Sequence, residues 1–563
     1  MHSSNSQSTA LTVRALVIGA LGSSVLTASS LFIALRMGML PWPISFAAIA
    51  SVLALKLFKS HNLHEANVMH AAMSAGSMIA GGLAFTIPGL WIMGLGQDLT
   101  IYEVLIAAFA GTLIGLIACA AFQPYFIREK QLAYPIGTAA ADTLTAVGNN
   151  GAQDAPALFW GLGLSGAYAA VRDVLHLIPS VLFASNAIPG VALGMYNSPM
   201  SIAIGFAVGV VPTAVWFIGA VLGHLGIVGM LPAAGIIETA TALDIRISLG
   251  LGLMLGSGAG TIAASVLRNK KMSKDDAMAP KDASSPTVAT TADTSVASNT
   301  NNPDEQSRRL STNLRIIALV CAIVVALICA VCKLSILSST VVVLATWFCI
   351  YLSAWLTGTT GINPMEVFGM LVLLLVQALF RITSMKLLFL IAAMVAVACG
   401  IGGDVMNDLK AGDRLNTNPQ EQMIGMIVGA FVGVLVSSLL LMGMYQVYGG
   451  NAFGPQGTFV AVQAANVAAM AGGISHIPAF MAGLALGGIL AAGGLPVMTL
   501  GLGVYLPFFM SCGAALGAAI KLILDKTNKL HGSRADSIVS GILGGESLVG
   551  VLIALFALFS FIR

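Results

Sequence analysis

Long apolar runs separated by short polar stretches make up most of this chain. The longest run without Asp, Glu, Lys or Arg extends from Gln422 to Ile520, and a second extends from Leu177 to Ile237. One membrane-spanning helix needs about 20 consecutive apolar residues, so each run is long enough for several spans. Because a helix satisfies its own backbone hydrogen bonds inside lipid, the pattern predicts an all-α polytopic membrane protein.

Dividing the apolar runs at their polar, Pro- and Gly-containing breaks predicts about 16 transmembrane helices, with the number of crossings around 364–421 left open. In the first half, the predicted spans and short elements are 12–36, 41–59, 65–94, 102–126, 135–147, 155–182, 199–220, 222–236 and 246–267. In the second half, they are 314–332, 335–357, 364–380, 385–403, 421–446, 456–472, 476–494, 497–522 and 537–562.

A motif that occurs twice indicates two repeated halves. Pro135-Ile136-Gly137-Thr138 reappears as Pro455-Gln456-Gly457-Thr458, so each half contains a short discontinuous helix. An even number of crossings in each copy would make the two repeats parallel. The predicted domains are a polar N-terminal tail at 1–10, a first membrane repeat at 11–267, a disordered cytoplasmic linker at 268–313 and a second membrane repeat at 314–563.

Weaker similarities extend the repeat. Pro199 followed by Gly205 is echoed by Pro496 followed by Gly503, and Gly96-Gln97-Asp98 is loosely echoed by Gly403-Asp404.

Composition and charge support a membrane location. The chain is 57% hydrophobic and 9% charged, whereas a soluble protein has about 25% charged residues. Its net charge of +3 does not indicate a nucleic-acid partner. Basic residues such as Lys56 and Arg128, together with the basic linker, fall on one side of the predicted spans. Because basic loops stay inside, the N-terminus, linker and C-terminus are predicted on the cytoplasmic side of the cell inner membrane.

Both copies of the repeated motif predict a helix that begins inside the membrane. Unwound backbone is tolerated there only where protein or a water-filled cavity satisfies it. Free N–H groups at Gly137-Thr138 and at Gly457-Thr458 would point toward a bound substrate. Paired breaks of this kind predict a substrate site, and the alternative for each is an ordinary kinked helix.

Polar side chains near the two breaks are further candidates for substrate binding. Asp142 lies one helical turn after Thr138 and could bind a substrate amine or carry a proton. The alternative is that Asp142 caps a helix at the membrane edge. Near the second break, the candidates are the neutral hydrogen-bonding groups of Tyr445, Gln463 and Asn466.

Four more carboxylates are candidates for proton coupling beside Asp142. Asp404 and Asp408 lie four residues apart, hence on one helix face, where mutual repulsion favours a proton on one of them. Glu366 begins a predicted helix, where an acid also stabilises the helix dipole. Glu546 lies inside the last predicted span, where a structural ion pair is the alternative.

The sequence shows no convergent set of catalytic or metal-binding residues. His64-Glu65 and His70 lack the H-E-x-x-H spacing, and no Walker A sequence is present. Gly161-x-Gly163-x-x-Gly166 lies in an apolar helix, where it indicates close helix packing rather than dinucleotide binding. We therefore predict that the chain is not an enzyme and has no cofactor and no metal site.

Three motifs resemble the oligopeptide transporter (OPT) family, most closely its prokaryotic branch and the related yellow-stripe-like metal-chelate transporters. They are Gly403-Asp404-x-Met406-x-Asp408-Leu409-Lys410-x-Gly412, the segment Gly137–Asp142, and Gly544-Gly545-Glu546-Ser547. The resemblance implies a secondary transporter that imports small peptides, glutathione-like thiols or metal chelates together with protons. Asp142 stands where the family often has Glu.

The leading hypothesis is thus a proton-coupled importer of small peptides or peptide-like and metal-chelate substrates. The alternative is a passive channel or facilitator for small polar solutes, which would not respond to a pH gradient. The expected partners are the substrate, protons and the lipid bilayer. The oligomeric state, including a homo-oligomer, stays open.

Overall fold

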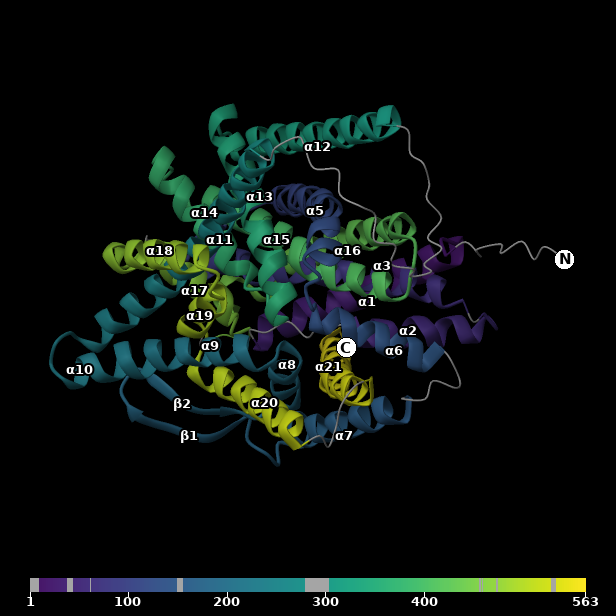
Figure 1. The fold of residues 1–563 in the computed structure, drawn as a ribbon, viewed down its shortest axis with the longest axis horizontal. Coiled ribbons are helices and arrows are strands. Elements are labelled where there is room, and N and C mark those ends of the chain that lie inside the picture. Colours follow the sequence, from purple (N-terminus) through teal and green to yellow (C-terminus); the bar gives the residue numbers. More distant parts are fainter. Residues whose placement is uncertain are drawn as a thin grey trace.

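The computed structural model of the chain is a bundle of helices with one short β-hairpin (Figure 1). It describes residues 10–37, 44–60, 62–148, 155–278, 303–454, 457, 459–471, 474–527 and 533–562.

The elements of the first half are α1 (Val13–Met37), α2 (Ile44–Leu57), α3 (Leu63–Ala84), α4 (Ile87–Ile92), α5 (Ile101–Gln123), a π-helical segment (Pro124–Glu129), α6 (Pro135–Gly148), α7 (Ala155–Asp173), β1 (Val181–Ile188), β2 (Val191–Tyr196), α8 (Pro199–Val208), α9 (Val210–Ala220), a second π-helical segment (Val221–Met230), α10 (Leu231–Ala233) and α11 (Thr239–Met278). The elements of the second half are α12 (Pro303–Cys332), α13 (Ile336–Thr360), α14 (Met365–Phe380), α15 (Met385–Arg414), α16 (Pro419–Tyr448), a 3₁₀ turn (Gly450–Ala452), α17 (Val462–Met470), α18 (Ile477–Ala492), α19 (Val497–Tyr505), α20 (Phe508–Thr527) and α21 (Ser533–Ile562).

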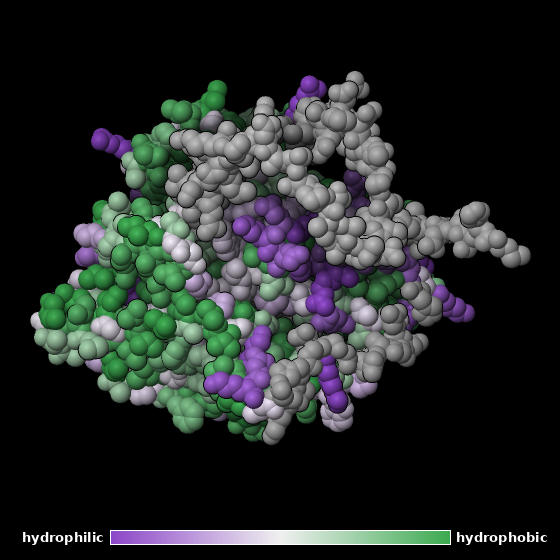
Figure 2. Space-filling view, viewed as in Figure 1, coloured by the Kyte–Doolittle hydropathy of each residue, from purple (hydrophilic) through white to green (hydrophobic). Residues whose placement is uncertain are grey.

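In the part of the chain that the structure describes, nine helices are long and apolar enough to cross a membrane, and shorter apolar helices lie among them. The chain is therefore a mostly helical polytopic membrane protein, as its apolar runs predicted. Several predicted spans are interrupted. Residues 199–220 form α8 and α9 around Gly209, which has a φ of +95°. Figure 2 shows a continuous apolar surface where Figure 1 places α9, α10 and α18.

The prediction of an entirely helical chain is wrong at one hairpin. The span predicted at 155–182 ends at Asp173, and β1 pairs with β2 in antiparallel register through Ile188 and Val191. Pro189 and Gly190 form the turn between the strands, and Gly190 has a φ of +79°, which glycine adopts readily. A Pro-Gly pair between two short, mainly apolar segments was the sequence signal for this hairpin.

Helix α15 lies at the centre of the packing. Every residue from Leu388 to Leu409 is buried, and the helix contacts α3, α5, α6, α13 and α14. Small residues along α15 allow these helices to approach closely. For example, a Cβ added to Gly402 would lie 2.2 Å from a side-chain carbon of Ile350 in α13. The carboxylates of α15 are consequently enclosed by protein.

Helices α3 and α15 cross in antiparallel directions. A Cβ on Gly82 would lie 2.7 Å from the side chain of Val397, and one on Gly400 would lie 3.2 Å from the carbonyl oxygen of Met78. Later residues of α3 therefore face earlier residues of α15.

Glycines hold α16 against α3 and α5 against α15 in matching, parallel pairs. The facing residues are Gly429 with Ala72, Gly433 with Gly76, Gly111 with Met394, and Gly115 with Ala398. The contact of α16 with α3 thus has the same form as the contact of α5 with α15.

A second set of matching contacts lies in the outer part of the bundle. Helix α7 packs on α21 and α18 packs on α11. Gly161 of α7 faces Ile538, Gly541 and Ile542, and Gly483 of α18 faces Leu249, Gly252 and Leu253 at the same relative positions. The predicted role of the Gly161 motif in helix packing is confirmed at Gly161 and Gly166, whereas Gly163 has no atom within 4 Å of an added Cβ.

Helices extend into the predicted linker at 268–313 from both of its ends. Helix α11 continues to Met278 and α12 begins at Pro303, while positions 279–302 lie outside the described residues. Disorder of the linker therefore stays a prediction for its central part.

Candidate functional site

Asp404 lies in the middle of α15 and is 2% exposed. Its Oδ2 accepts a hydrogen bond of 2.9 Å from Nδ2 of Asn363, which stands in the turn between α13 and α14. Its Oδ1 has no hydrogen-bond partner. An ionised carboxylate with an unpartnered buried oxygen is costly, so this enclosed arrangement favours the neutral acid.

Asp408 lies one turn further along α15 and is 1% exposed. Ser74 of α3 donates a hydrogen bond to its Oδ2, and Nε2 of His70 lies 3.5 Å from its Oδ1. Gln422 of α16 donates to its backbone carbonyl oxygen. Asp408 thus joins three helices of the central bundle through polar contacts.

Glu366 lies near the same cluster, in the first turn of α14. It is 7% exposed and follows the turn that contains Asn363. Because Met365 packs against Gly400 of α15, α14 begins at the level of the middle of α15. The structure therefore brings the predicted coupling residues Glu366, Asp404 and Asp408 into one buried region.

The first repeated segment, α6, packs directly against this region. The backbone N–H of Gly137 donates a 3.1 Å hydrogen bond to Oδ1 of Asn407, and a Cβ on Gly137 would lie 2.2 Å from the Asn407 carbonyl oxygen. Only glycine permits this approach. The hydroxyl of Thr138 instead donates to the carbonyl oxygen of Ala133. Oδ1 of Asp142 lies 3.5 Å from Nη2 of Arg414, at the end of α15.

The second repeated segment has a different environment. Gly457 precedes a short β-bridge between Phe453 and Phe459, and Pro455, Gln456 and Thr458 lie outside the described residues. Ala461 has a φ of +44° and donates its backbone N–H to the carbonyl oxygen of Leu35 in α1. The chain is therefore turned sharply before α17 begins.

Among the predicted polar residues of the second segment, one is more exposed than those of the first. Gln463 is half-buried, Asn466 is exposed, and Nδ2 of Asn466 lies 3.5 Å from Oε1 of Gln463. Tyr445 stacks on Trp91 with ring centroids 4.5 Å apart. The indole N–H of Trp91 is buried without a hydrogen-bond partner. Aromatic surface rather than charge characterises this segment.

The two segments lie toward opposite ends of α15. Gly137 contacts Asn407, whereas α17 packs on α4 at Gly89, which also faces Phe389. Phe389 and Asn407 are 18 residues apart on one helix, a distance of about 27 Å. The structure therefore places Asp142 beside Arg414, toward the end of α15 that contains Asp408, and it places Gln463 and Asn466 toward the opposite end.

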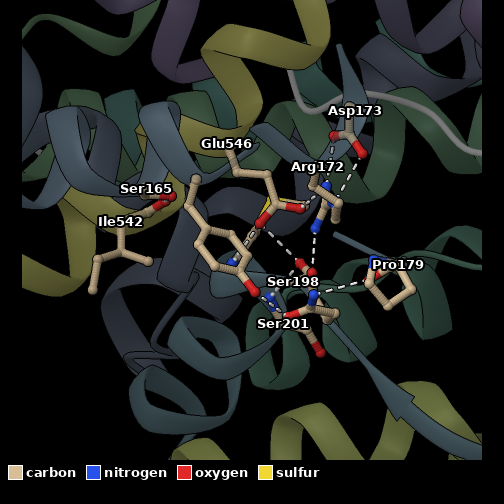
Figure 3. A network of polar contacts seen from close by, with 11 residues as sticks. Ser165, Arg172, Asp173, Pro179, Ser198, Ser201, Ile542 and Glu546 are labelled. Atoms are coloured by element: carbon tan, nitrogen blue, oxygen red, sulfur yellow. Dashed lines mark hydrogen bonds and ion pairs between the residues drawn. The ribbon is translucent and has the colours of Figure 1, made fainter. Parts of the chain in front are cut away.

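Glu546 belongs to a separate buried network (Figure 3). Its carboxylate accepts hydrogen bonds from Nη2 of Arg172 at 2.8 Å, from the hydroxyl of Ser198 at 2.9 Å and from the backbone N–H of Met200 at 2.8 Å. Arg172 also pairs with Asp173 at 2.7 Å. The network ties α7 and α21 to the first turn of α8, which is the geometry of the structural ion pair that was the alternative for Glu546.

Removal of one partner of this pair is expected to destabilise the protein strongly. Arg172 is 5% exposed and Glu546 is 6% exposed, so either variant, Arg172→Gln or Glu546→Gln, leaves buried polar groups unpaired. The expected loss is about 3–5 kcal/mol of unfolding free energy. Thermal or denaturant unfolding of the purified protein measures it. The double variant Arg172→Gln/Glu546→Gln tests whether the two side chains interact directly. A loss of unfolding free energy equal to the sum of the two single losses would contradict a direct interaction.

An ion-pair cluster joins α15 to the segment before α5 at the other end of the bundle. Nζ of Lys386 lies 3.0 Å from Oδ2 of Asp98 and 2.9 Å from Oε1 of Glu103. The hydrogen bond from Lys386 holds the pKa of Asp98 below its ordinary value. Asp98 therefore stays ionised near neutral pH at this exposed end of the protein.

Several residues of the central region were not predicted from the sequence. His70, Ser74 and Asn363 have polar side chains inside apolar helices or turns, and each contacts Asp404 or Asp408. His70 was considered only as a zinc ligand. The available signal was a titratable residue within an apolar span, which is a functional-site hypothesis by default.

In the described residues, no group of three or more His, Cys, Asp and Glu side chains is arranged to hold a metal ion. Nine candidate spans and carboxylates enclosed at the centre of the bundle define the chain as a polytopic membrane protein whose polar interior suits solute transport. The model of the family described as "OPT oligopeptide transporter protein" matches residues 10–557. The chain therefore belongs to the OPT oligopeptide transporter family, which is a family of transporters and not of enzymes.

One curated relative covers most of the chain. A Haemophilus influenzae protein named "Putative oligopeptide transporter" is 24% identical over 587 aligned positions. The alignment includes 90% of this chain and 89% of the relative. The chain is thus similar to this bacterial protein along nearly its whole length.

Proposed function

We propose that this chain is a secondary active transporter that imports small peptides, or peptide-like and metal-chelate substrates, together with protons. The family match over residues 10–557 supports oligopeptide transport. The observation that carries proton coupling is the enclosure of Asp404 and Asp408 in the second half of α15. Carboxylates held in such surroundings exchange protons when a conformational change opens them to water.

The matching contacts support two repeats of inverted, not parallel, orientation. Suppose that α3 of the first repeat corresponds to α15 of the second, and α5 of the first to α16 of the second. The contact between α3 and α16 then corresponds to the contact between α15 and α5. In both contacts, glycines of one helix face the backbone of the other in the same way. Because α3 and α15 run antiparallel, the axis that relates such repeats lies in the membrane plane. This replaces the expectation of parallel repeats and suits alternating access, in which one repeat moves against the other.

We propose that the two discontinuous segments line the two ends of one substrate pathway. Gly137, Thr138 and Asp142 would contact the substrate at one end, with Asp142 able to exchange protons beside Arg414. Gly457, Thr458, Gln463, Asn466 and Tyr445 would contact it at the other end. The distance of about 27 Å along α15 supports two ends rather than one closed site.

The face at which α1 and α3 begin is proposed to be cytoplasmic. Basic residues gather there, since Arg14 pairs with Glu65 at the start of α3, and Arg414 and Arg128 lie at the adjoining helix ends. The proposal therefore keeps the N-terminus and the linker on the cytoplasmic side, which was also the sequence-based expectation.

The C-terminus is proposed on the opposite side, which differs from the sequence-based expectation. Helix α6 ends at the cytoplasmic face, where Nζ of Lys56 donates to the carbonyl oxygen of Val147. Helix α7 begins seven residues after Gly148, and α21 runs parallel to α7. Green fluorescent protein fused after Arg563 is therefore expected to stay dark in a bacterial host. The same fusion within the linker is expected to fluoresce, and fluorescence from both would contradict this placement.

The proposed substrate class is tested by thermal stabilisation of the purified protein. Di- to pentapeptides, glutathione and ferric chelates are compared, because a ligand that binds only the folded state raises the unfolding temperature. Stabilisation by peptides or by chelates, but not by free amino acids at the same concentration, is the expected result. No stabilisation by any of the three classes would contradict the proposed substrates.

A further inference from the structure

His70 of α3 and Asp408 of α15 meet at the crossing of the two central helices. Nε2 of His70 lies 3.5 Å from Oδ1 of Asp408, and the two side chains are 0% and 1% exposed. Both residues are therefore fully enclosed in the part of the protein where α3 and α15 run antiparallel.

Several polar atoms around this contact have no hydrogen-bond partner. They are both ring nitrogens of His70, Oδ1 of Asp408, both side-chain polar atoms of Asn67 and Nδ2 of Asn407. Asn67 lies one helical turn before His70. Buried polar atoms without partners are rare, and water molecules usually satisfy them. The cluster thus has the chemistry of a hydrated site that accepts and donates protons.

We propose that His70 and Asp408 together form a proton site that binds one proton and releases it once in each transport cycle. This proposal rests on the proposed proton coupling and adds His70 as the second member of the site. With the proton bound, the pair is neutral overall, either as imidazolium with carboxylate or as imidazole with carboxylic acid. Release breaks one N–H or O–H bond, transfers the proton to water, and leaves the pair with one negative charge.

The pair suits this role because the nearest charged side chains on α2 and α3 interact with other groups. On α3, Glu65 is bound by Arg14 of α1, and on α2, Lys56 donates to a backbone carbonyl oxygen. The other ionisable groups on the surrounding helices are Asp404 and Lys410 on α15, Glu366 on α14, Cys119 on α5, Asp142 on α6 with Arg414, and Glu421 on α16, which accepts from the backbone of Ala10 and Leu11. The charged neighbours of Lys410 are Asp413 and Arg414 rather than Asp408. No described cation lies beside Asp408, so His70 is the group that can balance its charge.

A route for the proton leads toward the start of α3. A cavity of about 10 Å³, which holds about one water molecule, is lined by Ser60, Asn62, Leu63, Ala66 and Gly148 among others. None of the residues with unpartnered polar atoms lines this cavity, and Ala66 is the lining residue nearest to them along the chain. Because Asn67 and His70 lie in the first two turns of α3, the proton would leave on the face that is proposed to be cytoplasmic.

Movement of α3 against α15 provides the coupling. His70 and Asp408 stand on these two helices, which belong to different proposed repeats. Helix α3 packs most extensively on α1 and α16, whereas α15 packs most extensively on α5. A displacement of α3 along α15 lengthens the His70–Asp408 contact and removes the cation from the carboxylate. The affinity of the site for a proton thus differs between the two conformations, as coupled transport requires.

The test uses the full chain in liposomes with radiolabelled tetra-alanine as the probe. Two quantities are measured: accumulation driven by an inward-directed acid gradient, and exchange of internal for external peptide at equal pH. His70→Gln is expected to lose about tenfold or more of the gradient-driven rate and to keep exchange near the wild-type rate, because exchange needs no proton release. Asp408→Asn is expected to behave alike, and the double variant to be no worse than either single one.

His64→Gln provides the matched control on the same helix. Nδ1 of His64 lies 3.2 Å from the hydroxyl of Thr417, away from Asp408, so wild-type accumulation is expected. Wild-type accumulation in His70→Gln would overturn the proton site and leave the proposed function intact. Absence of gradient-driven accumulation in the unmodified protein would overturn the proposed coupling itself. If His70→Gln fails to fold, His70→Asn is measured, and loss of exchange together with accumulation would assign a structural role instead.

Discussion

Asp404→Asn is expected to abolish peptide accumulation driven by a pH gradient while the protein still inserts and folds. Asparagine keeps the size of the side chain and can still hydrogen bond to Asn363, but it cannot bind or release a proton. General acid–base groups contribute about 10²–10⁴-fold to the steps they serve, so the driven rate is expected to fall by at least that lower factor. Uptake into liposomes with and without an inward-directed acid gradient measures the effect.

The control for Asp404 is Asp98→Asn at the outer ion-pair cluster. The Asp98 side chain is 77% exposed and pairs with Lys386, so its removal is expected to leave accumulation unchanged. Asp142→Asn is expected to give an intermediate loss, because Asp142 is half-buried and faces Arg414. Accumulation at the wild-type level in Asp404→Asn would remove the central carboxylate from the mechanism.

Gly161→Leu is expected to separate α7 from α21 and to destabilise the protein by about 1–3 kcal/mol or more. A Cβ on Gly161 would lie 2.5 Å from the carbonyl oxygen of Ile538, which belongs to the backbone and cannot rotate away. The contact lies next to the network that Arg172 and Glu546 form between the same two helices. Thermal unfolding of the purified protein in detergent measures the loss.

Gly163→Leu is the matched control, two residues further along the same helix. An added Cβ there has no atom within 4 Å, so the larger side chain extends into open space. Leucine also has a higher helix propensity than glycine, which adds about 1 kcal/mol of stability in an exposed helix. Equal unfolding temperatures for the two variants would contradict the close packing of α7 on α21.

The apolar pattern predicted most of the helices because each span must satisfy its backbone internally. It could not predict where a span is interrupted. The break between α8 and α9 depends on the conformation of Gly209, and the hairpin depends on the turn at Pro189 and Gly190. Both features depend on local backbone conformation, which the pattern of apolar residues does not determine.

The repeat was found through Pro135 and Pro455, but part of its alignment needs tertiary contacts. The matching contacts pair Ala72 with Met394 and Gly76 with Ala398, and the same offset aligns Gly81 with Gly403, close to the offset between the two proline motifs. On this proposed alignment, Gly403-Asp404 would not correspond to Gly96-Gln97-Asp98. Helix direction is also absent from the sequence motif, which reads the same for parallel and inverted repeats.

The candidate site was predicted in part for a similar reason. Asp404 and Asp408 were recognisable as carboxylates one turn apart on a single helix. Their partners His70, Ser74 and Asn363 come from segments 40 to 340 residues away, by subtraction of their numbers, and no spacing rule connects them. The fold brings them together because the small residues of α3 and α15 allow the helices to cross closely.

The central claim is proton-coupled transport, and uptake by the unmodified protein tests it most directly. Liposomes that contain the purified chain receive radiolabelled tetra-alanine under an inward-directed acid gradient, with and without a protonophore. The account predicts accumulation above the external concentration that the protonophore abolishes. Uptake that stops at equal concentrations on both sides, with no response to the gradient, would contradict it and identify a passive facilitator.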